Sequence, residues 1–303
     1  MNNIAKSLGV VGVIASLCLQ AGAALAQDGR PVQVFPPGIR GGSEVVPEAR
    51  VEIRKYQFKP TNEELPYSVF VSSKIKPGQK APLIIALRGF TGTTLTFVRG
   101  TAVELAEEGG YILVGAIGYN NRAGYGTPPR TRPPAPPANP GAPAAAPPQM
   151  PPLVGGTAAT DPAKVTQYSE QDVMNVLAMV RKEFDIDDRR IYLMGHSQGG
   201  GGAAHLAEKY SSTWAAVALL APALFDVQLT AQSKILKVPL LLAVGEKDSL
   251  IGSVRSFSKQ MDSLGVAHEY VEMPGLDHGT VIMGSMPTVF RFFPKHVKPA
   301  GSH

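Results

Sequence analysis

The sequence contains almost no cysteine: Cys18 is the only one among its 303 residues. A single thiol excludes a disulfide framework and the common cysteine-rich zinc sites. Charged residues are also scarce, at 17% of the chain, against about 25% in typical globular domains. Apolar residues make up 44% of the chain, which is enough to bury a core and excludes disorder throughout.

Long apolar runs and concentrated basic charge are missing as well. After residue 26 no apolar run reaches about 18 residues, so we expect no membrane span in the remainder of the chain. The net charge is +5, but the lysines and arginines are scattered and form no stripe. We therefore expect no nucleic-acid partner.

The first 26 residues have the features of a secretory signal peptide. Lys6 precedes an apolar run from residue 8 to 25, and the small residues Ala24 and Ala26 form an A-x-A cleavage site. An uncleaved anchor is the alternative, but the run lacks a stop-transfer flank. We predict removal of residues 1–26 and a secreted or periplasmic mature protein without cysteine.

From residue 50 onward, segments with strand and helix patterns alternate. Such alternation is typical of βαβ units with a mainly parallel sheet covered by helices on both faces. The first two strands follow each other without a helix, so we expect them to form an antiparallel edge. The predicted strands are 51–56, 67–71, 83–87, 111–117, 190–194, 215–220, 238–244 and 268–273. The predicted helices are 97–108, 169–184, 198–210, 254–264 and 281–293.

These elements predict one α/β domain over residues 50–297. An extended segment, 27–49, precedes it, and a short tail, 298–303, follows it. Only about 18 residues separate Leu220 from the strand that begins at Val238, which is too few for an independent lid domain of more than about 40 residues. We therefore expect a single domain with an open active-site cleft.

A proline-rich insertion interrupts this domain, with 12 prolines among the 26 residues 127–152. Repeated proline favours polyproline II and cannot pair into a sheet. Two interpretations remain open: a solvated insertion, or a flap over the active site. The polar and aromatic residues just before it are expected to line a substrate pocket. They are Tyr119, Asn120, Asn121 and Tyr125.

Residues 195–199 form the motif G-x-S-x-G, as Gly195-His196-Ser197-Gln198-Gly199. It lies at the junction of a predicted strand and a predicted helix, where a nucleophile elbow must lie. The turn is sharp, so the residues two before and two after the serine must be small. Three further glycines follow directly, although each costs up to about 1 kcal/mol in a helix. Ser197 is therefore the candidate nucleophile.

A serine nucleophile needs a base and a carboxylate that orients the base. Asp248 and His278 each follow the carboxyl end of a predicted strand, the edge at which Ser197 also lies. Glu246 and Asp226 are alternative acids, and Asp277 is expected to point elsewhere. We regard His196 as more structural than catalytic.

The segment from Asp172 through residues 186–200 resembles secreted bacterial serine hydrolases of the α/β-hydrolase superfamily. It is similar to esterases related to feruloyl esterases and polyhydroxybutyrate depolymerases, and to prolyl oligopeptidase catalytic domains. The resemblance implies an α/β-hydrolase fold and an oxyanion hole made by the backbone N–H groups of Gln198 and Phe90. Arg88 stands where the family usually has histidine. It is either a structural anchor or a contact for a substrate carboxylate.

The function predicted from these observations is hydrolysis of carboxylic esters, of small-molecule or polymeric type, by a secreted serine hydrolase. Ser197 attacks, His278 transfers the proton and Asp248 orients the histidine. No metal or other cofactor is implied, and the oligomeric state is left open. The alternatives are a prolyl oligopeptidase-like peptidase, a polyester or feruloyl ester depolymerase, and a non-catalytic binding protein on a hydrolase scaffold.

Overall fold

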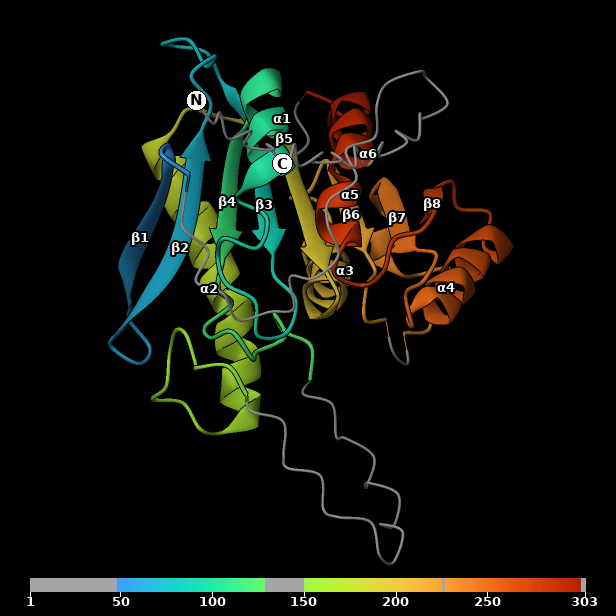
Figure 1. Ribbon diagram of the computed structural model, residues 1–303, viewed down its shortest axis with the longest axis horizontal. Coiled ribbons are helices and arrows are strands. Elements are labelled where there is room, and N and C mark those ends of the chain that lie inside the picture. Colours follow the sequence, from blue (N-terminus) through green and yellow to red (C-terminus); the bar gives the residue numbers. More distant parts are fainter. Residues whose placement is uncertain (1–47, 129–149, 225–226, 301–303) are drawn as a thin grey trace, which may run out of the picture. The chain divides into compact units, whose positions relative to one another are not determined.

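The computed structural model describes residues 48–128, 150–224 and 227–300 (Figure 1). The predicted signal peptide, nearly all of the segment 27–49 and most of the proline-rich insertion lie outside the described residues. So does Asp226, one of the alternative acids.

The centre of the domain is an eight-stranded sheet in the order β1-β2-β4-β3-β5-β6-β7-β8. The strand β2 runs antiparallel to both of its neighbours, and all other neighbouring strands are parallel. This confirms the predicted mainly parallel sheet with an antiparallel N-terminal edge. The strands are β1 (Val51–Phe58), β2 (Glu63–Val71), β3 (Ala81–Leu87), β4 (Ile112–Ala116), β5 (Ile186–His196), β6 (Ala216–Leu220), β7 (Leu240–Gly245) and β8 (Glu269–Met273).

The burial of the strands follows their apolar patterns. Every residue of β3, β4, β6 and β7 is buried, as expected for strands covered on both faces. Most residues of the edge strand β1 reach solvent, and only its two end residues, Val51 and Phe58, are buried. The carboxyl ends of β3, β5, β7 and β8 therefore share one edge of a rigid, buried sheet.

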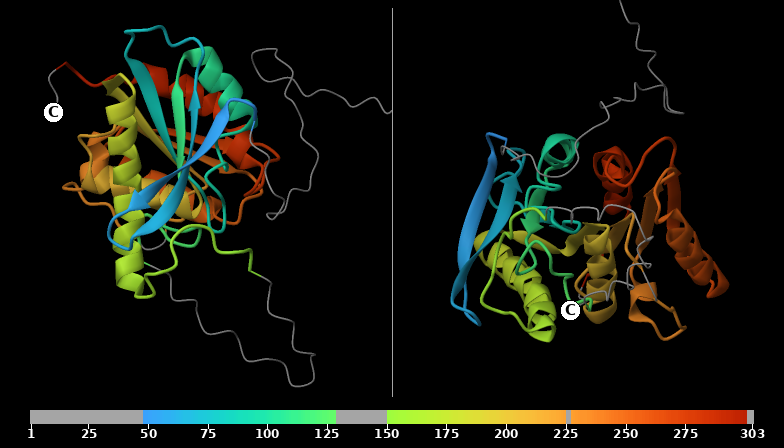
Figure 2. Two further views of the ribbon diagram at one scale, coloured as in Figure 1. Left: turned by 90° about the vertical axis from the view of Figure 1, so that its left-hand side faces the viewer. Right: turned by 60° about the horizontal axis from the view of Figure 1, so that its bottom comes forward.

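Helices cover both faces of the sheet, as Figure 2 shows. On one face α1 packs against α5 and α6, while α2 and α3 lie on the other face and α4 packs beside β7. The helices are α1 (Gly100–Gly109), α2 (Pro162–Glu183), α3 (Gln198–Lys209), α4 (Ile251–Ser263), α5 (Val281–Gly284) and α6 (Met286–Phe292).

Several predicted helix boundaries differ from the observed ones, and helix α4 begins three residues earlier than predicted, at Ile251. Helix α1 begins three residues later than predicted, at Gly100, whose φ is +50°. Helix α2 begins seven residues earlier, because the side chain of Asp161 accepts a hydrogen bond from the Ala163 N–H and Pro162 occupies the first turn. The single final helix predicted for 281–293 is wrong: α5 ends at Gly284, and a separate helix begins at Met286 with Pro287, which lacks an N–H, in its first turn.

The described part of the connection between β6 and β7 holds only a short 3₁₀ helix, Lys234–Lys237, and no lid domain. Across the residues that the structure describes, none of the helices has the length and apolar character needed to span a bilayer.

Candidate active site

Ser197 lies in the sharp turn between β5 and α3. Its backbone has φ 56° and ψ −119°, a conformation that costs of order 1–3 kcal/mol for a residue other than glycine. The Ser197 N–H donates to the Leu220 carbonyl at the end of the neighbouring strand, at 3.0 Å. The strained turn is thus held by the sheet, and it lifts the serine side chain to the rim as a half-buried group.

The glycines around Ser197 permit close backbone contacts. A Cβ on Gly195 would lie 2.1 Å from the Gly199 carbonyl oxygen, and one on Gly199 would lie 2.3 Å from the carbonyl oxygens of both Leu87 and Arg88. Real Cβ atoms do not approach backbone this closely. The sequence predicted small residues at these two positions. They must be small because the first turn of α3 packs directly on the ends of β3 and β5.

The three candidate catalytic side chains form one hydrogen-bonded chain. His278 Nε2 lies 2.9 Å from Ser197 Oγ, and His278 Nδ1 lies 2.8 Å from Asp248 Oδ2. The side chain of Asp248 is fully buried, whereas that of His278 is 41% exposed. The second oxygen of Asp248 accepts the Leu250 N–H at 2.8 Å, which fixes the carboxylate plane. The structure therefore brings together the residues that the sequence predicted.

The competing acidic residues point elsewhere. Glu246 accepts the N–H of Gly275 at 2.9 Å. Asp277 accepts the N–H groups of Gly279 and Thr280, and these hydrogen bonds hold its pKa below the usual range. Both carboxylates thus order the loop that carries His278, and neither is bonded to its ring.

The predicted oxyanion hole lies between the loop after β3 and the first turn of α3. A Cβ on Gly89 would lie 3.3 Å from the Ser197 Cβ, so this loop packs directly on Ser197. Neither the Phe90 N–H nor the Gln198 N–H donates to an acceptor among the described residues. Two free donors next to Ser197 are what a developing oxyanion requires.

This arrangement has counterparts among known proteins. Residues 161–231 match a family model described as serine aminopeptidase, S33, which covers α2, β5, the Ser197 turn, α3 and β6. No curated protein matches the chain in sequence. Solved structures match over most of the chain.

A ferulic acid esterase from Anaeromyces mucronatus, solved with ferulic acid, has a TM-score of 0.56 and 18% identity, over 88% of this chain and 98% of that one. An S-formylglutathione hydrolase from Agrobacterium tumefaciens has a TM-score of 0.57 and 17% identity, over 82% and 95% of the two chains. A fluorophosphonate-binding serine hydrolase from Staphylococcus aureus has a TM-score of 0.54 and 15% identity, over 81% and 99%. The chain has the α/β-hydrolase fold.

His196 holds the backbone of the loop that carries His278. Its Nε2 lies 2.7 Å from the His278 carbonyl oxygen, which only accepts, so Nε2 must carry the proton. The two rings lie 4.5 Å apart. Burial and the nearby His278 lower the pKa of His196 to about 3. His196 is therefore neutral at physiological pH, and it holds the backbone of the His278 loop, in agreement with a structural role.

His196 should also make the fold sensitive to acid. Its pKa is about 3 in the folded state and about 6.5 in the unfolded chain. Between these values only the unfolded state binds the proton, so the stability that neutral His196 contributes is lost as the pH falls below 6.5. The loss is about 1.4 kcal/mol per pH unit.

The measurement is urea unfolding of wild type and His196→Gln between pH 7 and 4. The glutamine amide does not titrate, and it can still donate to the His278 carbonyl. The difference in unfolding free energy between the two proteins should shrink by about 1.4 kcal/mol per unit below pH 6. Other titrating groups are common to both proteins and cancel. A difference that stays constant over this range would contradict the assignment of a neutral, buried His196.

The prediction that four residues before the proline-rich insertion line the substrate pocket is wrong for the two tyrosines. Tyr119 and Tyr125 are both fully buried. The side chain of Asn120 donates to the Gly156 carbonyl at 3.1 Å, and that of Asn121 donates to the Pro152 carbonyl at 3.0 Å. The two tyrosines pack in the interior and the two asparagines bond to neighbouring main chain, and polar composition alone could not distinguish these roles from a pocket lining.

Of the two roles predicted for Arg88, the structure supports the structural anchor. Its side chain is 1% exposed, and it donates to main-chain carbonyls and to the side chain of Gln198. The alternative, a contact with a substrate carboxylate, is not compatible with this burial. The link between Arg88 and Gln198 was missed by the sequence analysis, because 110 residues separate the two and no motif connects them.

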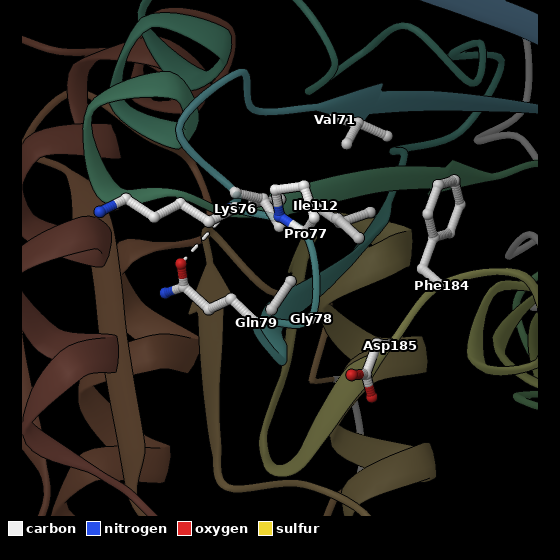
Figure 3. A pocket seen from close by; sticks show the side chains of 10 residues that line it. Val71, Lys76, Pro77, Gly78, Gln79, Ile112, Phe184 and Asp185 are labelled. Atoms are coloured by element: carbon white, nitrogen blue, oxygen red, sulfur yellow. Dashed lines mark hydrogen bonds between the residues drawn. The ribbon is translucent and has the colours of Figure 1, made fainter.

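A small pocket elsewhere in the domain does not belong to this site (Figure 3). Its apolar lining includes Val71, Ile112 and Phe184, and its charged lining residues are Lys76 and Asp185. It borders the residues that precede β3 and β5, whereas the nucleophile follows β5. The pocket thus lies at the opposite end of the parallel strands from Ser197.

Proposed function

We propose that this chain is a serine hydrolase that cleaves carboxylic esters through an acyl-enzyme intermediate on Ser197. The observation that carries the proposal is the chain of hydrogen bonds from Ser197 through His278 to the buried Asp248. Ser197 lies in the strand-to-helix turn of an α/β-hydrolase fold, which is where this chemistry places its nucleophile. The similarity to ferulic acid esterases and an S-formylglutathione hydrolase supports the choice of esters.

The proposed reaction begins when Ser197 Oγ attacks the ester carbonyl carbon and its proton passes to His278 Nε2. Asp248 accepts the Nδ1–H bond and stabilises the imidazolium. The N–H groups of Phe90 and Gln198 donate to the oxyanion of the tetrahedral intermediate. The intermediate collapses, the alcohol leaves with the proton from His278, and the acyl group remains on Ser197. A water molecule, deprotonated by His278, then hydrolyses the acyl-enzyme and regenerates the serine.

The exposed apolar side chains near the oxyanion loop support esters that carry an apolar group. Phe90 is 51% exposed, and Met150 is 48% exposed. The two segments are linked through Asn121, which accepts the Thr91 N–H at 2.7 Å and donates to the Pro152 carbonyl. An apolar acyl or alcohol group would cover this surface and remove it from water.

The test compares hydrolysis of p-nitrophenyl acetate, p-nitrophenyl butyrate and proline p-nitroanilide by the purified protein. We expect turnover of both esters, faster for butyrate, and none of the anilide. Turnover of the anilide alone would instead favour a peptidase. The match to the serine aminopeptidase model is the observation that supports this alternative. Failure to hydrolyse any of the three, with no labelling by a fluorophosphonate, would favour a binding protein.

We also propose that the protein is exported. The support is the sequence of residues 1–26, which lie outside the described residues. N-terminal sequencing of the protein recovered outside the cytoplasm should begin at Gln27, and a start at Met1 would refute the cleavage.

A further inference from the structure

Arg88 is a buried cation whose side chain donates to no carboxylate among the described residues. A guanidinium has five N–H donors, and each of them is used here. Nε donates to the Ile117 carbonyl, Nη1 to the Gly89 carbonyl and to Gln198 Oε1, all at 3.1 Å. Nη2 donates to the carbonyls of Asn120 and Ala123. No donor remains for a substrate.

The surroundings of the guanidinium compensate its charge without a direct ion pair. The Tyr125 ring lies 4.9 Å from the guanidinium carbon, which is a favourable cation–π distance. The carboxylate of Asp172 is fully buried nearby, attracts Arg88 electrostatically and accepts the Gly118 N–H at 2.7 Å. This network makes Arg88 a rigid group, because five directional bonds and a packed ring fix its plane.

The bond to the Gly89 carbonyl determines where the Phe90 N–H points. The Gly89 C=O and the Phe90 N–H belong to one peptide unit, which is planar and trans, so the two bonds point in opposite directions. The carbonyl accepts from Arg88 Nη1 at 3.1 Å and from the Gly92 N–H at 3.0 Å. With the carbonyl turned toward Arg88, the N–H is turned away from it.

The same nitrogen of Arg88 also reaches the other residue of the predicted oxyanion hole. Nη1 donates to Gln198 Oε1, while Gln198 Nε2 donates to the Arg122 carbonyl at 3.0 Å. The side chain of Gln198 is therefore tied to the β3 loop at one end and to the loop after β4 at the other. Arg88 Nη1 thus connects the two backbone segments whose N–H groups would bind the oxyanion.

We propose that Arg88 is a positioning residue that presets the oxyanion hole: it holds the Gly89–Phe90 peptide with its N–H toward the reacting carbonyl and ties that loop to Gln198. The proposal rests on the proposed ester hydrolysis at Ser197. A preset donor pays no reorganisation cost during the reaction and stabilises the transition state more than the bound ester. Loss of Arg88 should therefore lower kcat and leave KM nearly unchanged.

The experiment compares wild type with Arg88→Met, Arg88→Lys and Gln198→Leu on p-nitrophenyl butyrate, with rates normalised by fluorophosphonate titration of reactive serine. Removal of one oxyanion donor typically costs about 10²–10³-fold in kcat. We expect a loss of this order for Arg88→Met, a smaller loss for Arg88→Lys, and KM within about threefold. Gln198→Leu keeps its backbone N–H and should lose about tenfold, because only the tie is removed.

A second readout separates positioning from general structural support. Phenylboronic acid adds to a serine nucleophile as a tetrahedral anion, so its affinity reports the oxyanion hole. Across the variants, the loss of phenylboronic acid affinity should follow the loss of kcat. Arg99→Met is the matched control. This arginine donates to the Thr96 carbonyl in the same loop region and does not contact Gly89, so kcat should not change.

The outcomes distinguish this proposal from the proposed function. Suppose that wild type is active and that Arg88→Met folds. If the variant then has the kcat and the phenylboronic acid affinity of wild type, the proposed role of Arg88 is wrong, while the proposed ester hydrolysis is unaffected. Wild type that neither hydrolyses the ester nor binds phenylboronic acid removes the proposed function itself. If Arg88→Met does not fold, Arg88→Lys and Gln198→Leu decide: unchanged kcat in both refutes the proposal, and parallel losses in kcat and affinity support it.

Discussion

Replacing Ser197 with alanine should lower kcat for p-nitrophenyl butyrate by at least about 10⁵-fold, because no acyl-enzyme can form without the hydroxyl. The fold should remain, since the lost oxygen bonds only to His278 Nε2 at the half-exposed rim. Fluorophosphonate labelling should disappear with the activity. Kinetics, labelling and the thermal unfolding midpoint are measured on the same preparation.

The matched control is Ser212→Ala, at an exposed serine beyond the C-terminal end of α3 whose side chain contributes no hydrogen bond to the site. It should retain full activity and full labelling. If Ser197→Ala keeps activity within tenfold of wild type, another residue is the nucleophile and the proposed mechanism is wrong. If it loses activity but keeps the label, a second reactive serine exists and must be located.

Replacing Gly195 with alanine should destabilise the protein by more than about 4 kcal/mol, a size reserved for a few mechanisms such as unrelievable overpacking. The new Cβ would lie 2.1 Å from the Gly199 carbonyl oxygen and 2.5 Å from its carbonyl carbon. Both atoms belong to backbone in the first turn of α3, between two buried strands, so neither can move without displacing Ser197. We expect little soluble protein and an early unfolding transition in urea.

Gly252→Ala is the matched control, and it should change the free energy of unfolding in the opposite direction. Gly252 lies in α4, it is exposed, and a Cβ there would meet nothing within 4 Å. Alanine should raise stability by about 0.5–1 kcal/mol, because glycine is the poorer helix former. If the unfolding free energy of Gly195→Ala lies within about 1 kcal/mol of that of wild type, the tightly packed turn at Ser197 is not rigid.

The meeting of Ser197, His278 and Asp248 was predictable because each of them lies next to an element with a strong local pattern. Ser197 follows a continuous apolar strand and precedes a run of glycines, while Asp248 and His278 follow the strands β7 and β8. Parallel strands bring their carboxyl ends to one edge. Local sequence therefore determines which three side chains meet, even though 81 residues separate Ser197 from His278.

Helix ends were less predictable where two local signals compete. Asp161 and Pro162 mark the start of α2, but the apolar periodicity used to recognise the helix begins only near Val173. The division of the last helix depends on Pro287, which periodicity alone does not register. Such boundaries are set by capping and by the missing proline N–H, not by the apolar face.

The sequence by itself determined the parallel α/β sheet, the antiparallel edge and the residues that meet at its rim. Short-range patterns of apolar residues and glycine specify strands and turns, and the rules of chain topology determine how those strands are arranged in the sheet. Only the tertiary structure decided that Tyr119 and Tyr125 are buried, that His196 holds the His278 backbone, and that Arg88 bridges Gly89 and Gln198. These roles depend on hydrogen bonds between segments far apart in the chain, whose partners are backbone carbonyls. Every residue has a carbonyl, so no sequence pattern distinguishes the one that a side chain will find.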